Sequence, residues 1–383
     1  MILKKCTIYL LFLITLISAE TVFATVLENE TIGAKAQPMG AAFCAIADDS
    51  SAVFFNPAGL SFNERNEWNG QLWAYYNKVK FKYETPTTMD KNTEYYLIPC
   101  FFIGKAYDRR AFGYGLYTPL GGGGYAFDRI EANIPGLQGA NMEILMGVTF
   151  NHVAVSYKLM PNLSIGGGLF SCIGNYEEKI DGNRKEYDSY NAGYGGNIGI
   201  LYKPVDNFSI GFAARSEILI KMDGNETING IKYDSELEFT IPYVYDIGFA
   251  YKPIKDLTLS INFCRSLWSD MDKYEFEIED TRQLSFYDSW RIGVGMHYQI
   301  NQKLSFLAGI KDKRPSQNKE DGAIFPGSME VNLFAYSAAI SYQMTHTLEM
   351  NLGMTYSYGT DDYHSQKETA EHYTPSGGIR FKF

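Results

Sequence analysis

The sequence predicts a transmembrane β-barrel of fourteen antiparallel strands, with a small N-terminal helical segment that plugs the lumen. Three observations indicate this fold: an export signal, strands in which apolar and polar side chains alternate, and a turn unit that recurs along the chain. In each unit, a Tyr followed by Lys or Gln ends one strand, and an apolar residue beyond a short polar turn opens the next. The tyrosines of the five clear copies are 45, 49, 47 and 44 residues apart, at Tyr157, Tyr202, Tyr251, Tyr298 and Tyr342.

A row of short turns with aromatic ends is typical of one rim of a membrane barrel. A weaker sixth copy begins at Tyr107. We expect the tight turns on the periplasmic side, near Pro161, Asn207, Asp256, Asn301 and His346. Longer polar segments lie between these turns and are expected to form extracellular loops, at residues 181–189, 223–236, 313–330 and 361–371.

The first residues have the pattern of a secretory signal peptide. Lys4 and Lys5 precede an apolar run over residues 8–17, and Val22-Phe23-Ala24 offers small residues at the cleavage positions. The run is too short for a comfortable membrane span, which favours a signal cleaved after Ala24 over an anchor. Residues 1–24 are therefore expected to be removed on export.

Composition excludes several classes of protein. The net charge is −10, and it becomes −11 without the signal because that segment carries two lysines and one glutamate. Such a chain does not bind nucleic acid through a basic surface. Aromatic residues make up 15% and glycines number 36, which is high for a soluble enzyme and suits a barrel with aromatic girdles. No apolar run of eighteen residues follows the signal, which argues against transmembrane helices.

The barrel is expected over residues 66–383. Its strands alternate as lipid-facing strands should: apolar residues at 257, 259, 261 and 263 are interleaved with smaller or polar ones. One hairpin per tyrosine spacing gives seven hairpins and fourteen strands, an even number as closure requires. We expect the first strands near 67–85, 92–105 and 110–118, the last at 372–383, and a bulge near Asn151-His152. The terminal Phe383 resembles the signal that outer-membrane barrels present to the barrel-assembly machinery.

Residues 25–65 do not alternate and are expected to form a hatch. Their alanine-rich apolar stretches are cut by helix-capping residues, among them Asp49, Ser50 and Asn56, and Pro57 suits a first helical turn. A small apolar segment of short helices needs a surface to bury. The only large surface nearby is the barrel lumen, so the hatch is expected to plug it.

Four stretches resemble the FadL/TodX family of outer-membrane hydrocarbon transporters: residues 33–43, 47–60, 115–121 and 153–168. Asn56-Pro57-Ala58 matches the hallmark tripeptide of the family's hatch. The resemblance implies a fourteen-stranded barrel in the outer membrane of a Gram-negative, diderm bacterium. It further implies passive uptake of long-chain fatty acids or other hydrophobic molecules, which leave sideways through a gap at a kinked third strand.

The expected gap is at Gly113 and Gly115, because glycines in a strand permit a kink or bulge. Asn56-Pro57-Ala58 is expected to lie against the wall there, where Asn56 can supply both a donor and an acceptor to backbone groups freed from the ladder. Replacement of Asn56 is therefore expected to impair uptake while the barrel stays folded.

Polar residues in phase with the lumen are candidates for ligand contact. The favoured interpretation is that they form ion pairs that hold wall and hatch together. The alternative is ligand contact, since an interior arginine could bind a fatty-acid carboxylate bidentately. These residues are Arg215, Glu217, Asp246, Arg291, Lys311 and Glu349.

Nothing in the sequence indicates an enzyme, a cofactor or a metal site. No local hydrolase, metalloprotease or nucleotide-binding motif occurs, and the histidines are scattered. The mature cysteines form no ligand-like spacing, so packed free thiols are favoured over a disulfide between Cys172 and Cys264. The other two are Cys44 and Cys100.

Two hypotheses of function follow. The leading one is a monomer that takes up a hydrophobic small-molecule ligand and contacts outer-membrane lipid. The alternative is an outer-membrane structural or assembly partner of a secretion system, without uptake activity. A general porin is disfavoured by the expected plug.

Overall fold

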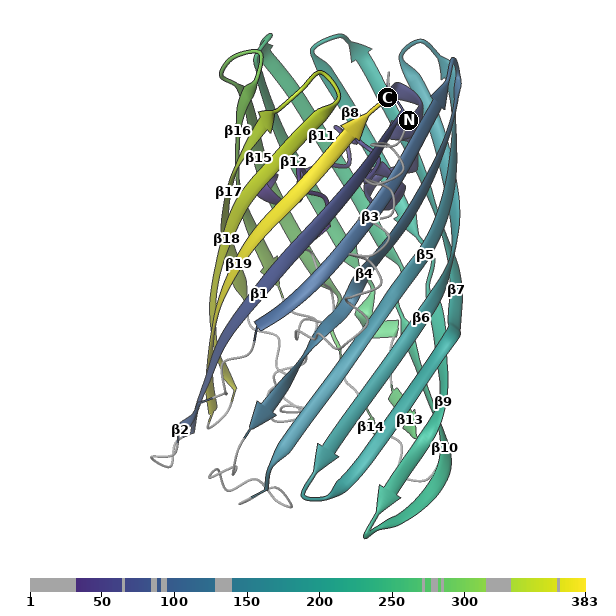
Figure 1. The fold of residues 1–383 in the computed structure, drawn as a ribbon, viewed down its shortest axis with the longest axis vertical. Helices are drawn as coiled ribbons and strands as arrows, with labels where there is room; N and C mark the ends of the chain where they lie inside the picture. The colour runs from purple at the N-terminus through teal and green to yellow at the C-terminus, as the bar shows by residue number, and fades with distance from the viewer. Residues whose placement is uncertain are drawn as a thin grey trace, which may run out of the picture.

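The structure is a computed structural model. It describes residues 32–63, 66–83, 88–90, 95–127, 140–270, 273–276, 282–283, 286–314, 332–363 and 366–383, so the expected signal peptide lies outside the described residues. One antiparallel sheet closes on itself, because the first wall strand pairs with the last (Figure 1). No helix among these residues is long and apolar enough to cross a membrane.

Fourteen wall strands are formed by the described residues, as the sequence predicts. Two of them are interrupted, at residues 216–217 and 242–243, so each carries two labels. In order they are β1 (Glu67–Tyr83), β3 (Tyr95–Tyr107), β4 (Arg110–Phe127), β5 (Met142–Met160), β6 (Leu163–Ile180), β7 (Asn183–Val205), β8 with β9 (Phe208–Arg215, Ile218–Ile228), β10 with β11 (Ile231–Ile241, Val244–Ile254), β12 (Leu257–Ser266), β15 (Ser289–Gln299), β16 (Leu304–Arg314), β17 (Leu333–Gln343), β18 (Leu348–Tyr363) and β19 (Gln366–Lys382). Three short strands are appended: β2 (Thr88–Asp90), β13 (Lys273–Phe276) and β14 (Arg282–Gln283).

The recurring turn unit has a structural cause at the short-turn rim, the end of the barrel that carries these turns. The residue after each tyrosine donates its backbone N–H to a carbonyl of the preceding turn along the chain, at 2.7–2.8 Å. This bond links neighbouring hairpins around the rim, so each hairpin must return to the same level. The bonded pairs are Lys158 to Arg109, Lys203 to Asn162, Lys252 to Asn207, Gln299 to Asp256 and Gln343 to Lys303, and Lys382 to Thr347 continues the series.

The side chains of the unit divide between the two faces of the wall. The tyrosines are about two-fifths exposed on the outer face, as an aromatic girdle requires. The lysines of two copies face inwards, where the ammonium groups of Lys158 and Lys203 lie 5.1 and 4.0 Å from the ring centre of Phe62. In these two copies, the tyrosine faces the lipid and the lysine that follows it contacts the hatch in the lumen.

Several expected boundaries are wrong. Residues 181–189 and 223–236 are not loops but parts of β6–β7 and β9–β10, which turn at Asp181-Gly182 and Asn229-Gly230 with positive φ at all four residues. Residues with positive φ suit the tight primed turns of hairpins. The segment 361–371 is mostly strand as well, and most of 313–330 lies outside the described residues.

The bulge expected near Asn151-His152 is also wrong. These residues keep a continuous register with β6, and the apolar side chains of Val148 and Phe150 face inwards beside His152. The apolar residues of β5 change phase because they face inwards up to Phe150 and outwards from Val153 onwards. The irregularity is in the facing strand β4, whose register with β5 shifts between Tyr117 and Leu120 and again between Gly121 and Gly123.

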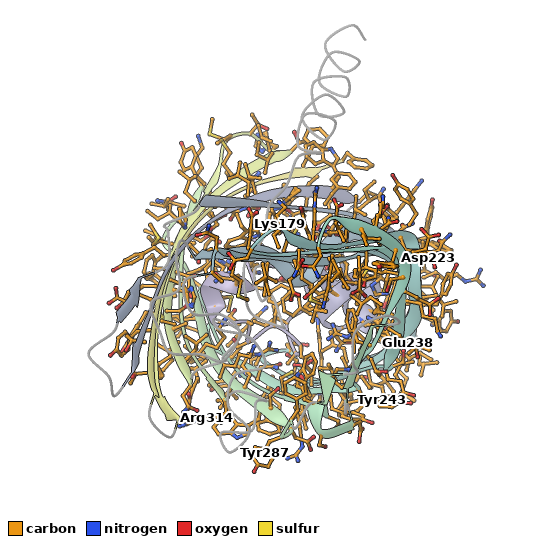
Figure 2. All side chains as sticks on the ribbon, turned by 90° about the horizontal axis from the view of Figure 1, so that it is seen from below. Lys179, Asp223, Glu238, Tyr243, Tyr287 and Arg314 are labelled. Carbon is orange, nitrogen blue, oxygen red and sulfur yellow. The ribbon has the colours of Figure 1, made fainter. Side chains whose placement is uncertain are left out.

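The hatch, residues 32–63, lies inside the barrel toward the short-turn rim (Figure 1). It contains two 3-10 helices, η1 (Gln37–Met39) and η2 (Pro57–Phe62), and the single turn α2 (Ala52–Phe55). Almost every side chain is buried, including Phe43, Val53 and Leu60. A view along the barrel axis from the opposite end shows the hatch inside the ring of strands (Figure 2).

Pairs of glycines on neighbouring strands let the hatch backbone reach the wall. In each pair the two glycines are direct cross-strand partners, and a Cβ on either would meet hatch atoms. Removing the Cβ at both positions brings the wall close enough for backbone-to-backbone contact. The pairs and the hatch residues that they face are Gly104–Gly113 with Ser50, Val53 and Leu60, Gly166–Gly199 with Asn56 to Ala58, Gly211–Gly248 with Cys44 and Ala45, and Gly295–Gly309 with Met39 and Gly40.

We predict that Gly166→Val displaces the hatch. A Cβ at Gly166 would lie 2.5 Å from the Ala58 nitrogen and from the Pro57 carbonyl carbon. Both are backbone atoms, so they cannot move aside unless this part of the hatch moves. Overpacking of this kind costs on the order of 1–3 kcal/mol. The measurement is protease cleavage at Lys35 of the hatch in membrane fragments, which should become several-fold faster.

The matched control is Gly167→Val on the other face of β6, where the nearest atom to a Cβ is 3.4 Å away. Equal cleavage rates in the two variants would contradict the proposed fit between hatch and wall.

Candidate functional site: the lumen and the seam between β3 and β4

The β3–β4 ladder stops halfway along the two strands. Their last pair is Phe101 with Leu116. Beyond it, β3 stays paired with β1 and β4 stays paired with β5, but β3 and β4 no longer pair with each other. We call this region, residues 95–100 of β3 and 117–127 of β4, the seam.

Prolines explain why the ladder ends there. Pro99 lies two residues beyond the last pair on β3, and Pro119 lies three residues beyond it on β4. Neither has an N–H to donate, and prolines are confined to strand edges and bulges for that reason. The N–H of Thr118 hydrogen-bonds instead to the side chain of Cys100. The sequence therefore removes donors from both strands at one level of the wall.

The inner side of the seam is apolar and tightly packed. Ile98, Cys100 and Leu120 are buried there. The ring of Tyr117 stacks on Phe102 with centroids 5.3 Å apart, and it meets the hatch residue Phe54 edge-on, also at 5.3 Å.

Gly113 and Gly115, where the sequence predicted the opening, lie in regular ladder. Gly113 pairs with Gly104 and Ala154, and Gly115 pairs with Phe102 and His152. Gly113 faces the hatch, and a side chain at Gly115 would meet the ring of Phe102. The loss of pairing begins just beyond them, because it follows the prolines and not the glycines.

The Asn56-Pro57-Ala58 tripeptide does not lie near the third wall strand, β4, as expected. It packs on β6 and β7, where Gly166 and Gly199 make room for its backbone. The Nδ2 of Asn56 donates to the carbonyls of Cys44 at 2.9 Å and Ile200 at 3.0 Å, and its Oδ1 accepts from Ala58 N at 3.1 Å. Asn56 thus caps η2 and also ties the hatch to the wall at β7.

A small cavity of about 40 Å³ lies between the hatch and the wall. Its apolar lining includes Phe54, Phe55 and Pro119, and its polar lining includes Arg215, Asp246 and Arg291. Arg291 pairs with Asp246 at 3.5 Å, and Asn262 donates to the same carboxylate at 2.7 Å. A space of this size holds a few waters and not a long ligand.

Arg215 stands apart from that ion pair. Its guanidinium lies 5.6 Å from the ring centre of Phe54 and 5.8 Å from that of Phe150. Its Nε is buried without a hydrogen-bond partner among the described residues. A buried donor without a partner is costly, and this one lines the cavity.

The other candidates from the sequence lie elsewhere. Glu217 is exposed at the break between β8 and β9, where Tyr243 Oη donates to it at 3.4 Å, so it does not line the cavity. Glu349 lies toward the short-turn rim and pairs with Lys382 at 2.8 Å. Lys311 is buried in the wall strand β16 and is not part of the cavity lining.

An ionic cluster ties the hatch to the strands that close the barrel. Arg380 of β19 donates to Glu67 of β1 at 2.7 Å and to the Asp48 carbonyl at 3.2 Å, and Ser50 N donates to Glu67 at 2.5 Å. Burial opposes ionisation of Asp48, but Lys35 and Arg380 together hold its pKa well below the usual range. Burial raises the pKa of Asp49 to about 6, against the opposing effect of Arg380.

Beyond the cavity, apolar side chains line part of the inner face toward the far end of the barrel, together with buried charged residues such as Glu178, Lys185 and Glu226. One contiguous cluster of buried apolar side chains extends from β9 and β10 through β6, β5 and β4 to β3 and the hatch. Along this path lie Met222, Phe239, Phe170, Phe150 and Tyr117. On the outer surface, ion pairs such as Lys179 with Glu143 and Lys221 with Glu238 cross the strands at this far end, which Figure 2 views end-on.

The four described cysteines are buried free thiols. Sequence reasoning did not identify Pro99, Tyr117, His152 or Asn197 as functional residues. The one signal that could have located the seam was a pair of prolines, Pro99 within one expected strand and Pro119 directly after the next, since a proline has no backbone donor.

Comparison with known proteins gives a consistent result. The family model described as outer membrane protein transport protein (OMPP1/FadL/TodX) matches residues 24–383. The chain is similar to outer membrane protein P1 of Haemophilus influenzae, with 21% identity over 85% of this chain and 84% of that protein. It is also similar to the long-chain fatty acid transport protein of Escherichia coli O6:H1, with 22% identity over 86% of each chain.

Solved structures share the fold. A FadL homologue from Pseudomonas aeruginosa superposes with a TM-score of 0.78 at 14% identity, covering 95% of this chain and 100% of that one. A toluene transporter, TodX, from P. putida gives a TM-score of 0.70 at 16% identity, covering 94% and 99%.

We predict that Asn56→Ala loosens the hatch while the barrel stays folded. The change leaves the carbonyls of Cys44 and Ile200 without this donor inside the lumen, at a cost of about 2 kcal/mol for two hydrogen bonds. Protease cleavage of the hatch should accelerate, while heat-modifiable migration of the barrel on gels stays unchanged.

Asn63→Ala is the control, because the Asn63 amide nitrogen is buried and has no partner among the described residues. Cleavage of the Asn56 variant at the rate of the Asn63 variant would show that the tripeptide does not fasten the hatch.

Proposed function

The chain belongs to the OMPP1/FadL/TodX family of outer membrane transport proteins, and on that premise we propose that it takes up hydrophobic molecules passively and releases them sideways through the seam. As a member of this family it is an outer-membrane transport protein and not an enzyme. Its substrate and its route of release are the content of the proposal.

One observation carries the lateral route: the ladder between β3 and β4 ends at Phe101 and Leu116. The cluster of buried apolar side chains that reaches this place supports it. On its outer face the seam is flanked by exposed apolar residues such as Leu97 and Leu116. A molecule that leaves here passes from an apolar lumen to an apolar exterior. It never has to enter water, which apolar solutes avoid at about 25 cal/mol per Å².

The axial route is less favourable for such molecules. The hatch fills the lumen toward the short-turn rim, and the spaces beyond it are lined mainly by polar and charged side chains, including Lys35, His297 and Glu349. The hatch leaves little room for a ligand on this path, and an apolar ligand gains nothing from its polar lining. These features support lateral release.

The substrate proposed is an apolar chain that carries a carboxylate. Arg215 supports this choice, because its guanidinium lies in the cavity between two aromatic rings with an Nε that lacks a hydrogen-bond partner among the described residues. A guanidinium binds a carboxylate in a planar, bidentate manner. Arg291, the other arginine that lines the cavity, is already paired with Asp246. The alternative hypothesis, a partner of a secretion system, has no feature of the described residues in its favour.

We predict that Pro99→Val combined with Pro119→Val slows uptake. Restoring both N–H groups allows the β3–β4 ladder to continue, and two added hydrogen bonds contribute about 1 kcal/mol each. Uptake of a labelled long-chain fatty acid and of toluene should both fall roughly tenfold, because both would leave by the same route.

Pro375→Val is the control, since β19 keeps its register with β18 through Pro375. Wild-type uptake of both compounds by the double variant, with intact heat-modifiable migration, would rule out the seam as the exit.

We predict that Arg215→Met separates charged from neutral ligands. Loss of a charged hydrogen bond of about 1.5–3 kcal/mol should raise the half-saturating concentration of the fatty acid more than tenfold, with no change for toluene. Arg265→Met removes an exposed cation paired with Asp288 and serves as control. An equal effect on both ligands would contradict carboxylate recognition by Arg215.

A further inference from the structure

Four residues that are far apart in the sequence form one buried chain of hydrogen bonds. The hydroxyl of Tyr117 lies 2.6 Å from His152 Nδ1, and His152 Nε2 lies 3.1 Å from Asn197 Oδ1. The Nδ2 of Asn197 then donates to the backbone carbonyl of Val53 at 2.9 Å. The chain therefore links β4, β5 and β7 to α2 of the hatch.

The direction of every bond in this chain is fixed. The Val53 carbonyl can only accept, so the amide of Asn197 must turn its NH₂ toward the hatch and its oxygen toward His152. That oxygen also only accepts, so His152 must carry its proton on Nε2. Its Nδ1 is then a lone-pair acceptor in the neutral ring, and Tyr117 must donate to it. The hatch carbonyl sets the orientation of the tyrosine hydroxyl three bonds away.

One end of this hydrogen-bond chain lies at the seam, and the other end lies in the hatch. Tyr117 is the first residue of β4 beyond the last β3–β4 pair, and its ring packs against Phe102 on the inner side of the seam. Val53 belongs to the hatch and would contact any side chain at Gly113. Both Tyr117 and His152 are almost fully buried, so water does not compete for these bonds.

We propose that this hydrogen-bond chain couples the hatch to the seam, with His152 as the positioning residue that holds Tyr117 across the inner side of the seam. While Val53 is in place, all three bonds are satisfied and Tyr117 is held. When the hatch moves, Asn197 loses the partner that fixes its amide, and His152 loses the acceptor that fixes its tautomer. Tyr117 is then released. The consequence for transport rests on the proposed lateral exit, whereas the coupling itself does not.

Gly168 offers a way to cut the chain without removing a polar group. A Cβ at Gly168 would overlap His152 Nε2 and lie 2.7 Å from Asn197 Oδ1, so Gly168→Ala forces these two atoms apart. Asn197→Leu breaks the chain at its hatch end, and Tyr117→Phe breaks it at its seam end. Gly167→Ala is the matched control, because its nearest neighbour would be 3.4 Å away.

Native cysteines report on the seam independently of transport. Cys100 belongs to the seam, and Cys172 is equally buried in β6 among the inner wall residues. The full-length protein in lipid vesicles is treated with a membrane-permeant maleimide, and the alkylation rate of each cysteine is read by peptide mass spectrometry. Folding of each variant is checked by heat-modifiable migration.

We expect Gly168→Ala, Asn197→Leu and Tyr117→Phe each to raise the alkylation rate of Cys100 roughly three- to tenfold, with Cys172 unchanged. Wild-type reactivity of Cys100 in the Gly168 and Asn197 variants would overturn the proposal, and so would an equal rise at Cys172, which would indicate general loosening. A ¹⁵N spectrum of labelled histidine supplies a second readout: His152, assigned with His152→Gln, should carry its proton on Nε2, and a proton on Nδ1 would also overturn it.

Because alkylation requires no substrate, these results stand whether or not the Pro99/Pro119 variant changes uptake. Normal uptake in that double variant together with raised Cys100 reactivity in the Gly168 variant would reject the exit and keep the coupling.

Discussion

The fit of the hatch backbone against paired glycines of the wall is the constraint on which the rest of the structure depends. A barrel of fourteen strands encloses more space than its own inward side chains fill, so an open lumen would pass water and small solutes. Four cross-strand glycine pairs bring the hatch into direct contact with the wall around its circumference. The ion pair of Arg380 with Glu67 adds a polar link at the strands where the barrel closes. The plug is therefore held by shape as well as by charge, and it occupies the axial path.

If ligands leave sideways, as we propose, the side wall carries the exit. A hydrophobic ligand needs an apolar route throughout, and a continuous ladder would deny it one, because backbone groups in a membrane must be paired. In the proposed route, Pro99 and Pro119 resolve this conflict at the seam. They lack the donors that a ladder would use, so β3 and β4 stay unpaired with each other there, while β3 remains paired with β1 and β4 with β5. The hydrogen-bond chain from Val53 to Tyr117 then joins the plug to the place where pairing ends.

The sequence predicts the barrel, its strand number and the position of the hatch, because each follows from a local rule. The tyrosine spacing works since rim hydrogen bonds bring every hairpin to the same level. Loop boundaries failed at 181–189 and 223–236 because polar residues beyond the membrane can still be strand, and polarity alone does not separate the two. The contacts of Asn56 with β7 and the pairing of His152 with Asn197 depend on strand register over 45 residues or more, which no local pattern contains. The opening expected at Gly113 and Gly115 is misplaced for a related reason. A strand glycine can mark either a kink or a close approach of another segment, and here Gly113 faces the hatch.

The most direct test of lateral release is to locate a ligand on its way out. Crystals of the protein soaked with a long-chain fatty acid brominated at its methyl end would show the bromine by anomalous scattering. Lateral release predicts a bromine peak between residues 95–100 of β3 and 117–121 of β4, with the carboxylate toward Arg215. Bromine found only on the hatch side of the lumen toward the short-turn rim, with the seam empty, would contradict it.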